Sequence, residues 1–385
     1  MKTYDDTHKQ LGLLTACPPD RPTAAAPLAV LDDARQRGTT FHEVPVKAIL
    51  NSPATTGMGF WSLNPYVGCE FGCTYCYARE THRWVMEKAD GRSGGQADSG
   101  SVSQQRFDSE AETDAESLTA RPPDRLPSWL AFEKQILVKT SAAAVLTRTL
   151  FPARLAGASL VIGTATDPYQ PAERKFRLTR GILEALRGWK GLSLSIITKS
   201  PLILRDLDVL LELSQRHELS VNISIASVDA ATLRKLEARS PAPHARMRAL
   251  KGLTDAGIYA GVMMAPVIPG VTDSREQLAA VMAAGKEAGA RYVVGGALRL
   301  GPAARARFLP QLAQEYPDLV GRYTSRFGQS QSPGADYIDA LNRRIRLLQQ
   351  EYGFPVTNGM SGRPDRKVLK PSRGVPDVAE QWSLL

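Results

Sequence analysis

The sequence predicts an α/β fold with a largely parallel sheet, arranged as a partial (β/α)6 barrel that continues into a helical C-terminal extension. Short apolar runs of strand length alternate along the chain with longer segments whose apolar residues recur at helical spacing. A loop dense in cysteine directly follows the first predicted strand. In barrels of this kind the reactive groups lie in the loops that follow the strands, so this loop is the first candidate for a functional site.

The predicted strands are short apolar runs, and we count about six strand–helix units. The strands are residues 61–68, 159–165, 192–199, 219–227, 258–268 and 291–300. The clearest helix-like segments between them are residues 174–189, 202–217 and 274–289. This alternation favours a barrel or partial barrel over a doubly wound sheet.

Composition divides the rest of the chain. Residues 1–40 are rich in Pro, Ala and Asp and have no periodic apolar face, so we expect a disordered N-terminal arm. Residues 41–300 form the predicted core. Residues 86–128 are rich in Gly, Ser, Asp and Glu and read as a disordered acidic insertion within that core. Residues 301–385 form the predicted C-terminal helical extension.

The chain of 385 residues carries a net charge of +9, which suits a polyanionic partner such as nucleic acid or simply gives a soluble basic surface. No run approaches the roughly 18 apolar residues of a membrane span, so we expect no membrane partner. The apolar run before Cys17 is too short for a signal peptide, and we expect a cytoplasmic protein.

The segment "CEFGCTYCYAR" places Cys69, Cys73 and Cys76 on one loop, where Gly68 and Gly72 let the backbone curl. Three thiolates so closely spaced can bind one small inorganic object. A structural zinc ion normally takes four protein ligands, and His82 is the nearest candidate for the fourth. An iron–sulfur cluster held by three thiolates instead keeps one iron open, and an open metal position is typical of catalysis.

The pattern Cys69-x3-Cys73-x2-Cys76, with Tyr75 before the last cysteine, resembles the signature of the radical S-adenosylmethionine enzymes. The resemblance implies a [4Fe–4S] cluster whose fourth iron binds the amino and carboxylate groups of S-adenosyl-L-methionine. One electron then cleaves the sulfonium to a 5′-deoxyadenosyl radical, which abstracts hydrogen from a substrate. It also implies an electron donor such as flavodoxin or ferredoxin as a partner.

Further stretches resemble the spore-photoproduct-lyase-like branch, often labelled DNA repair photolyase-like. They cover residues 41–329 and include "NPYVGCEFGCTYCYAR", "ATDPYQPAERKFRLTRGILEAL", "ITKS", "LEARSPAPHARMRAL", "GVMMAPVIPGVTD" and "SRFGQ". The resemblance implies that six polar or aromatic side chains bind the cofactor: Tyr75, Thr164, Thr166, Asp167, Lys199 and Ser224. An ammonium suits the methionine carboxylate, and a hydroxyl suits the ribose.

One position departs from that branch. True spore photoproduct lyases have a hydrogen-returning cysteine just past the second strand, and the matching residue here is Ala165, with no cysteine after Cys76. The resemblance therefore implies a lyase-like or modifying radical enzyme, but not a true spore photoproduct lyase. The catalytic residues that face the substrate stay unassigned.

Three functions remain open at this point. The first is radical chemistry on a nucleic acid, for lesion repair or modification. The second is the same chemistry on a peptide or a small metabolite, and the third is a non-catalytic module that binds zinc or a cluster. Basic residues of the C-terminal segment could line a phosphate-binding rim or form a solvated helical face: Arg305, Arg307, Arg322 and Arg326.

Overall fold

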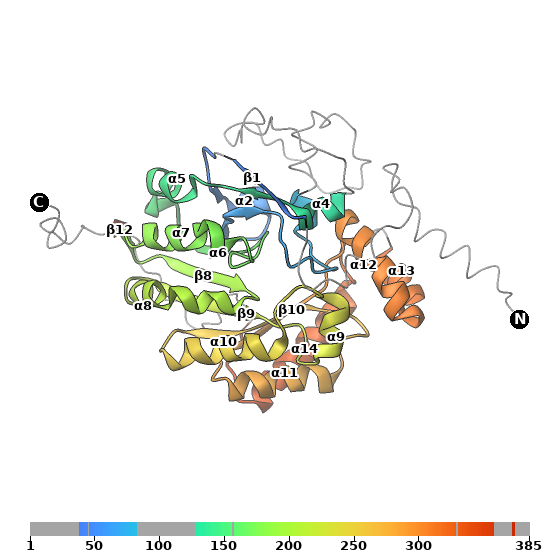
Figure 1. Cartoon of the computed structure of the whole chain (residues 1–385). Helices are drawn as coiled ribbons and strands as arrows, with labels where there is room; N and C mark the ends of the chain where they lie inside the picture. The colour runs from blue at the N-terminus through green and yellow to red at the C-terminus, as the bar shows by residue number, and fades with distance from the viewer. Residues whose placement is uncertain are drawn as a thin grey trace, which may run out of the picture.

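The computed structural model describes residues 38–44, 46–82, 128–155, 158–328, 330–357 and 372–373 (Figure 1). The predicted arm (up to residue 37) and the predicted acidic insertion (up to residue 127) lie outside the described residues.

The centre of the molecule is a seven-stranded sheet with the strand order β11-β10-β9-β8-β6-β3-β2. All neighbours are parallel except β2 (Leu50–Asn51), which pairs with β3 in antiparallel fashion at one edge. The six parallel strands are β3 (Trp61–Leu63), β6 (Ser159–Ile162), β8 (Ser193–Thr198), β9 (Glu218–Ser224), β10 (Ala260–Val267) and β11 (Val293–Ala297). The predicted α/β class with a parallel sheet is confirmed.

The prediction of one continuous strand at residues 61–68 is wrong. This segment forms two strands, β3 and β4 (Tyr66–Val67), which are separated at Asn64 and Pro65. Proline has no N–H to donate to a ladder, so the chain leaves the large sheet there. β4 joins a second sheet of order β1-β5-β4, with β1 (Thr40–Glu43) and β5 (Gln135–Val138). The cysteine loop therefore starts from the smaller sheet.

Amphipathic helices alternate with the strands because each one buries an apolar stripe against the sheet. In α7, Ile182, Leu183 and Leu186 are all buried. Figure 1 shows this layer of helices beside the sheet. Its members are α5 (Ala142–Thr149), α7 (Leu178–Leu186), α8 (Leu207–Arg216), α10 (Pro243–Asp255) and α11 (Arg275–Glu287).

Short elements complete the connections between these strands and helices. They are α2 (Pro53–Thr56), α4 (Ser128–Lys134), η3 (Pro152–Leu155), α6 (Glu173–Phe176), β7 (Trp189–Lys190), η4 (Pro201–Asp206), α9 (Ala230–Leu236), η5 (Pro317–Leu319) and β12 (Ser372–Arg373). Among the described helices, none combines the length and the apolar character needed to cross a lipid bilayer.

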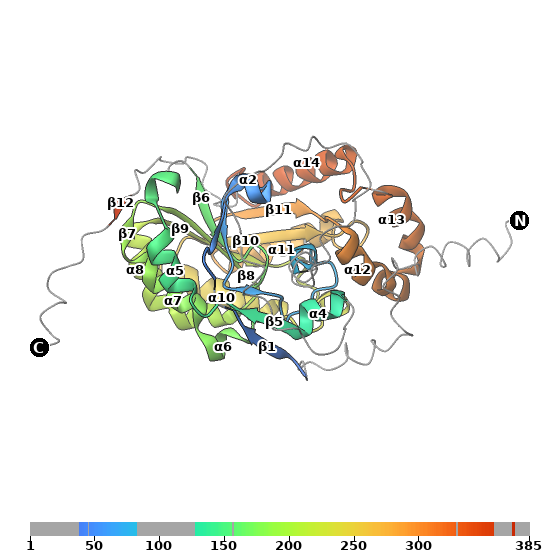
Figure 2. The same cartoon turned by 90° about the horizontal axis from the view of Figure 1, so that it is seen from above.

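Three helices follow the last parallel strand: α12 (Pro302–Glu315), α13 (Val320–Phe327) and α14 (Ala335–Glu351). The carboxylate of Glu80 accepts hydrogen bonds from the backbone N–H groups of Ala303 (2.6 Å) and Ala304 (3.2 Å), so α12 begins beside the cysteine loop. α14 lies along β11, as seen from above in Figure 2. These helices close one side of the core around the candidate site.

Candidate functional site

The cysteine loop is a series of tight turns that starts at the end of β4. Gly68 and Gly72 have φ angles of 90° and 58°, which side chains other than glycine rarely allow. The N–H of Cys69 donates to the carbonyl of Phe132 at 2.9 Å, and the N–H of Cys76 donates to the carbonyl of Cys73 at 3.2 Å. Cys69 and Cys73 are buried, and Cys76 is partly exposed.

The three thiols fit a cluster that takes three thiolates. Burial raises the pKa of each thiol, and for Cys73 the pKa is about 11 although nearby Lys199 acts to lower it. A thiol of this kind ionises when it binds a metal, because the ligand form is the thiolate. No described residue after Cys76 is a cysteine, so the loop offers three thiolates and no fourth.

The alternative zinc site, with His82 as a fourth ligand, is not formed. The Nε2 atom of His82 lies 3.2 Å from the carbonyl of Gln135, and its ring packs edge-on against Phe132. Within the described ranges, no group of three or more His, Cys, Asp or Glu side chains is placed to hold a single metal ion. The geometry thus disfavours one ion bound by the three cysteines and His82.

Three of the predicted cofactor residues meet next to the cysteine loop. Nζ of Lys199, at the end of β8, donates to Oγ of Ser224 on β9 at 3.1 Å. The same ammonium lies 5.7 Å from the ring centroid of Tyr75 and 3.9 Å from Oε1 of Glu237. The structure therefore brings together a cation, a hydroxyl and an aromatic ring from three separate segments.

The sequence did not reveal the anchor of this group, which is Glu237 with Arg246. Glu237 is buried and accepts hydrogen bonds from Tyr75 Oη and Arg246 Nη2. Burial acts to raise the pKa of Glu237, but Arg246 and Lys199 outweigh burial and hold that pKa below its usual value. Burial likewise acts to lower the pKa of Lys199, but Glu237 and Cys73 outweigh it and the pKa is raised. Lys199 therefore stays charged within this group. Glu237 and Arg246 both lie in the stretch "LEARSPAPHARMRAL", which is the sequence feature that could have identified them.

The other three predicted residues join neighbouring loops. Asp167 accepts hydrogen bonds from Thr198 Oγ1 (2.7 Å) and from the backbone N–H of Lys199 (2.7 Å), so it ties the loop after β6 to the end of β8. Thr166 Oγ1 donates to the carbonyl of Gly68 at 2.6 Å. Thr164 Oγ1 accepts a 3.0 Å hydrogen bond from Asn64. These bonds position the cysteine loop and Lys199.

A second buried group of charges lies under the cysteine loop, where the carboxylate of Glu133 contacts three guanidinium groups. Arg79 donates to it at 2.6 Å, Arg239 also donates, and Nε of Arg307 lies 3.4 Å away. Burial acts to raise the pKa of Glu133, but the three arginines hold it below its usual value. Arg307 thus belongs neither to a phosphate-binding rim nor to a solvated helical face.

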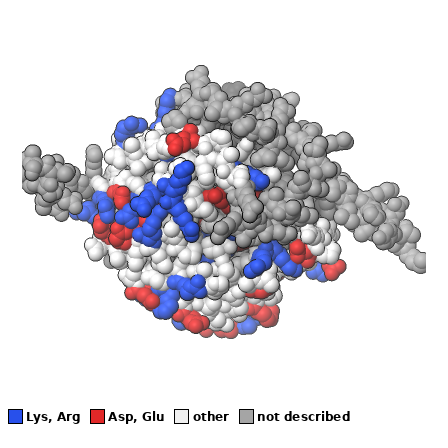
Figure 3. Space-filling view, in the orientation of Figure 1, with Lys and Arg blue, Asp and Glu red and all other residues white. Residues whose placement is uncertain are grey.

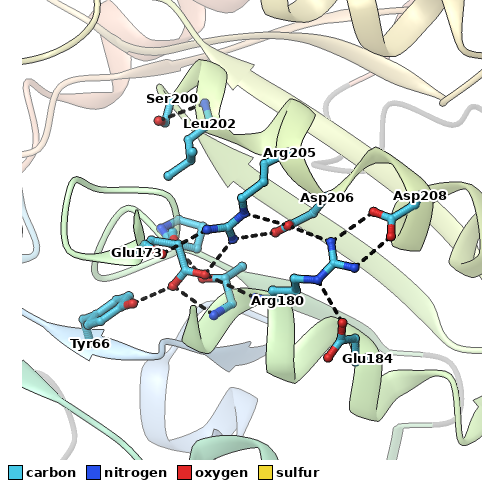
Figure 4. Close-up of polar contacts among 11 residues, drawn as sticks. Tyr66, Glu173, Arg180, Glu184, Ser200, Leu202, Arg205, Asp206 and Asp208 are labelled. Carbon is cyan, nitrogen blue, oxygen red and sulfur yellow. Dashed lines mark hydrogen bonds and ion pairs between the residues drawn. The ribbon is translucent and has the colours of Figure 1, made fainter. Parts of the chain in front are cut away.

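The smaller sheet is anchored by the ion-pair network of Figure 4. Oη of Tyr66, on β4, donates to Oε2 of Glu173 at 2.5 Å, and Arg205 donates to Oε1 of Glu173 at 2.9 Å. Arg205 also pairs with Asp206, which Arg180 contacts at 3.2 Å. Because Tyr66 lies three residues before Cys69, this network fixes the start of the cysteine loop against η4 and α6.

A pocket of about 320 Å³ opens beside the cysteine loop. Residues from the cysteine loop and from the loops after β6, β8 and α9 line it, among them Phe71, Tyr169, Arg174, Leu202, Arg239 and Ser240. Ser240 connects the pocket to the thiols, because its Oγ lies 3.4 Å from Sγ of Cys73. The pocket thus combines aromatic and aliphatic surface with guanidinium groups.

Comparison with known proteins gives both sequence and structural relatives. No protein-family model matches the sequence. The uncharacterized protein Rv2578c of Mycobacterium tuberculosis is 33% identical over 317 residues, which cover 82% of each chain. The uncharacterized protein MJ0683 of Methanocaldococcus jannaschii is 27% identical over 213 residues, 55% of this chain and 61% of MJ0683. A spore photoproduct lyase structure with bound AdoMet and dinucleoside spore photoproduct has a TM-score of 0.53 and 14% identity, covering 91% of this chain and 92% of that one.

Proposed function

Because the chain belongs to the family of Rv2578c and has the spore-photoproduct-lyase-like fold of the radical S-adenosylmethionine enzymes, we propose that it is a radical enzyme of this type. The observation that carries the proposal is the position of the cysteine loop. Among the described residues, three thiols lie beside a charged lysine, a hydroxyl and an aromatic ring at the carboxyl ends of parallel strands, and no fourth thiol joins them. We also propose that the six parallel strands and their helices form the partial (β/α)6 barrel that the sequence predicts.

In this proposal Cys69, Cys73 and Cys76 hold a [4Fe–4S] cluster, which supplies one electron for the cleavage of S-adenosylmethionine to a hydrogen-abstracting radical. Lys199 binds the methionine carboxylate through a charge-assisted hydrogen bond, and Ser224 orients the ribose. Tyr75 provides a flat apolar face next to the adenine. Asp167 and Thr166 keep Lys199 and the cysteine loop at fixed positions through their hydrogen bonds.

The expected partner is an electron donor such as flavodoxin or ferredoxin. We place the chemistry in the cytoplasm, where reducing conditions keep thiols free. Ala165 occupies the position where true spore photoproduct lyases have their cysteine, so we expect the product radical to be quenched by another group.

A nucleic acid is the proposed substrate class, for lesion repair or modification. The pocket beside the cysteine loop supports it, because the exposed Arg174 lines the pocket and offers a charge for a phosphate. Figure 3 shows Lys and Arg gathered on the face that contains α6, where Arg174 and Lys175 are exposed. A spore photoproduct lyase of this fold binds a dinucleoside photoproduct.

Reductive cleavage tests the proposed chemistry. Protein reconstituted without oxygen from iron and sulfide is expected to convert S-adenosylmethionine to 5′-deoxyadenosine and methionine when dithionite is added. The Cys73→Ala variant is expected to lose this activity, and Cys17→Ala is the matched control that keeps it. A reconstituted protein that does not cleave S-adenosylmethionine, or a Cys73→Ala variant that does, contradicts the proposal. Iron analysis separates the cluster from a zinc site.

Binding measurements at several salt concentrations test the substrate class. Contacts with phosphates release counterions, so affinity for single-stranded DNA or RNA is expected to fall steeply as salt rises. The Arg174→Gln variant is expected to bind more weakly and with a shallower salt slope. Absent or salt-independent binding contradicts the nucleic acid and favours a peptide or small metabolite as substrate.

A further inference from the structure

We propose that Arg239 and Ser240 raise the reduction potential of the cluster, as positioning residues that act on its ligands. This inference rests on the proposed function and assigns a role to two residues of the stretch "LEARSPAPHARMRAL" that the sequence analysis left without one. Both lie in the turn after α9, so they approach the cysteine loop from a segment more than 160 residues away in the chain. The fold therefore brings both residues to the cysteine loop.

Ser240 acts on one ligand directly. Its Oγ lies 3.4 Å from Sγ of Cys73, within the range of a hydrogen bond to sulfur. When Cys73 is a thiolate, the hydroxyl is the donor, because a thiolate can only accept. Hydrogen bonds to the sulfur ligands of an iron–sulfur cluster stabilise its more negative, reduced form.

Arg239 brings a buried positive charge against the backbone of the same loop. Its side chain is 3% exposed, its Nε donates to the carbonyl of Glu70 at 2.9 Å, and its Nη2 donates to Glu133. The guanidinium packs so closely on Gly72 that a Cβ there would overlap Nη2. Glycine at position 72 is thus what admits the charge between Cys69 and Cys73.

One donor of Arg239 is still available. Among the described residues, its Nη1 is buried and has no hydrogen-bond partner. A buried cationic N–H is costly to leave unsatisfied, and an anionic acceptor removes that cost. The protein atoms around Nη1 supply no such acceptor, whereas a thiolate-ligated cluster on the adjacent loop is anionic.

The direction of the effect follows from the charges. With three thiolate ligands, the oxidised cluster carries one net negative charge and the reduced cluster carries two. A nearby positive charge and a hydroxyl donor favour the state with more negative charge. Removal of either group therefore lowers the midpoint potential and makes the cluster harder to reduce.

The test is a redox titration of the full chain with its cluster reconstituted, in which electron paramagnetic resonance measures the reduced cluster at each potential. The Arg239→Gln variant keeps hydrogen-bond donors but loses the charge, and we expect the equilibrium constant for one-electron reduction to fall about tenfold, a drop of about 59 mV. The Ser240→Ala variant is expected to show a smaller fall in the same direction. The Arg239→Lys variant keeps the charge and should recover most of the potential. Arg234→Gln, on the exposed face of α9, is the control and should match the wild type.

Two results would overturn the proposal. The first is an Arg239→Gln variant that has full iron content and the midpoint potential of the wild type. The second is a midpoint potential that falls equally in Arg239→Lys and Arg239→Gln. If Arg239→Gln does not hold the cluster, the Ser240→Ala midpoint decides: a lower value supports the proposal, and an unchanged one overturns it. A wild-type protein that assembles no cluster contradicts the proposed function instead, so the two failures are distinguishable.

Discussion

Gly68 has a backbone conformation, with φ of 90°, that favours glycine, and it lies where β4 passes into the cysteine loop. A Cβ at this position would lie 2.9 Å from the carbonyl oxygen of Phe132 and 3.0 Å from that of Gln135. Both obstacles are backbone atoms, which cannot rotate away as a side chain can. The residue is therefore required by local geometry as well as by conformational freedom.

The Gly68→Ala substitution is expected to lower the free energy of unfolding by about 1–3 kcal/mol, because the strained backbone and the contacts act together. Cluster content after reconstitution should fall with it. Thermal unfolding and iron analysis measure the two effects. Gly321→Ala is the control: Gly321 lies in helix α13 with open space around it, so alanine should be neutral or stabilising. Equal effects at the two positions would contradict the geometric argument.

Lys199 is expected to bind the cofactor by its charge. Substitution by methionine keeps the length of the side chain but removes a charge-assisted hydrogen bond, which should weaken S-adenosylmethionine binding by about 10- to 100-fold. Cluster assembly should persist because Lys199 is not a thiol ligand. Anaerobic equilibrium dialysis measures the affinity, and Lys190→Met, at an exposed position of β7, is the control. An unchanged affinity in Lys199→Met would remove the residue from the cofactor site.

At the scale of elements, His217 connects the end of α8 to its neighbours. Its Nδ1 accepts a 3.2 Å hydrogen bond from the N–H of Leu192, so Nε2 carries the proton and donates to the carbonyl of Leu186 at 3.1 Å. Burial lowers the pKa of His217 from 6.5 to about 4, although the bond to Leu186 partly opposes this. The neutral ring thus holds α7, α8 and the start of β8 together.

This pKa makes the fold sensitive to acid. Between pH 6.5 and about 4 the unfolded chain binds a proton at His217 that the folded chain does not bind. The free energy of unfolding should therefore fall as the pH decreases through this range, by on the order of 3 kcal/mol for this residue. In His217→Gln this part of the pH dependence should disappear. Urea unfolding at several pH values measures it, and identical slopes in the two proteins would contradict the assignment.

At the scale of the whole molecule, α14 closes the core beside the edge strand β11. Leu348 is buried, whereas Leu347, its neighbour in the same helix, is 65% exposed. Leu348→Ala is expected to cost about 2–5 kcal/mol of unfolding free energy, and Leu347→Ala should change it little. Denaturant unfolding of the two variants compares them. Similar effects would mean that α14 does not pack as described.

The six parallel strands of the large sheet were predictable because each lies within an apolar run that alternates with helical segments, whereas β2 was not predicted. The cysteines belong to a spaced motif, whereas Lys199 and Ser224 were marked by the resemblance to the spore-photoproduct-lyase-like branch. The smaller sheet could not be predicted, since β4 has two residues and pairs with β5 about 70 residues later. Glu133 with its three arginines was equally hidden, because its members come from four distant segments whose proximity depends on the completed fold.

The departure of the chain from the large sheet at Asn64 and Pro65 means that the site stands on two scaffolds. The thiols are attached to the smaller sheet, while Lys199 and Ser224 belong to the larger one. Hydrogen bonds such as that from Thr166 to Gly68 join the two halves. Sequence changes in the strands of the larger sheet can therefore leave the attachment of the cysteine loop to the smaller sheet intact. The boundary at Asn64 and Pro65 is therefore a place where protein engineers could exchange the segment of the smaller sheet and its cysteine loop.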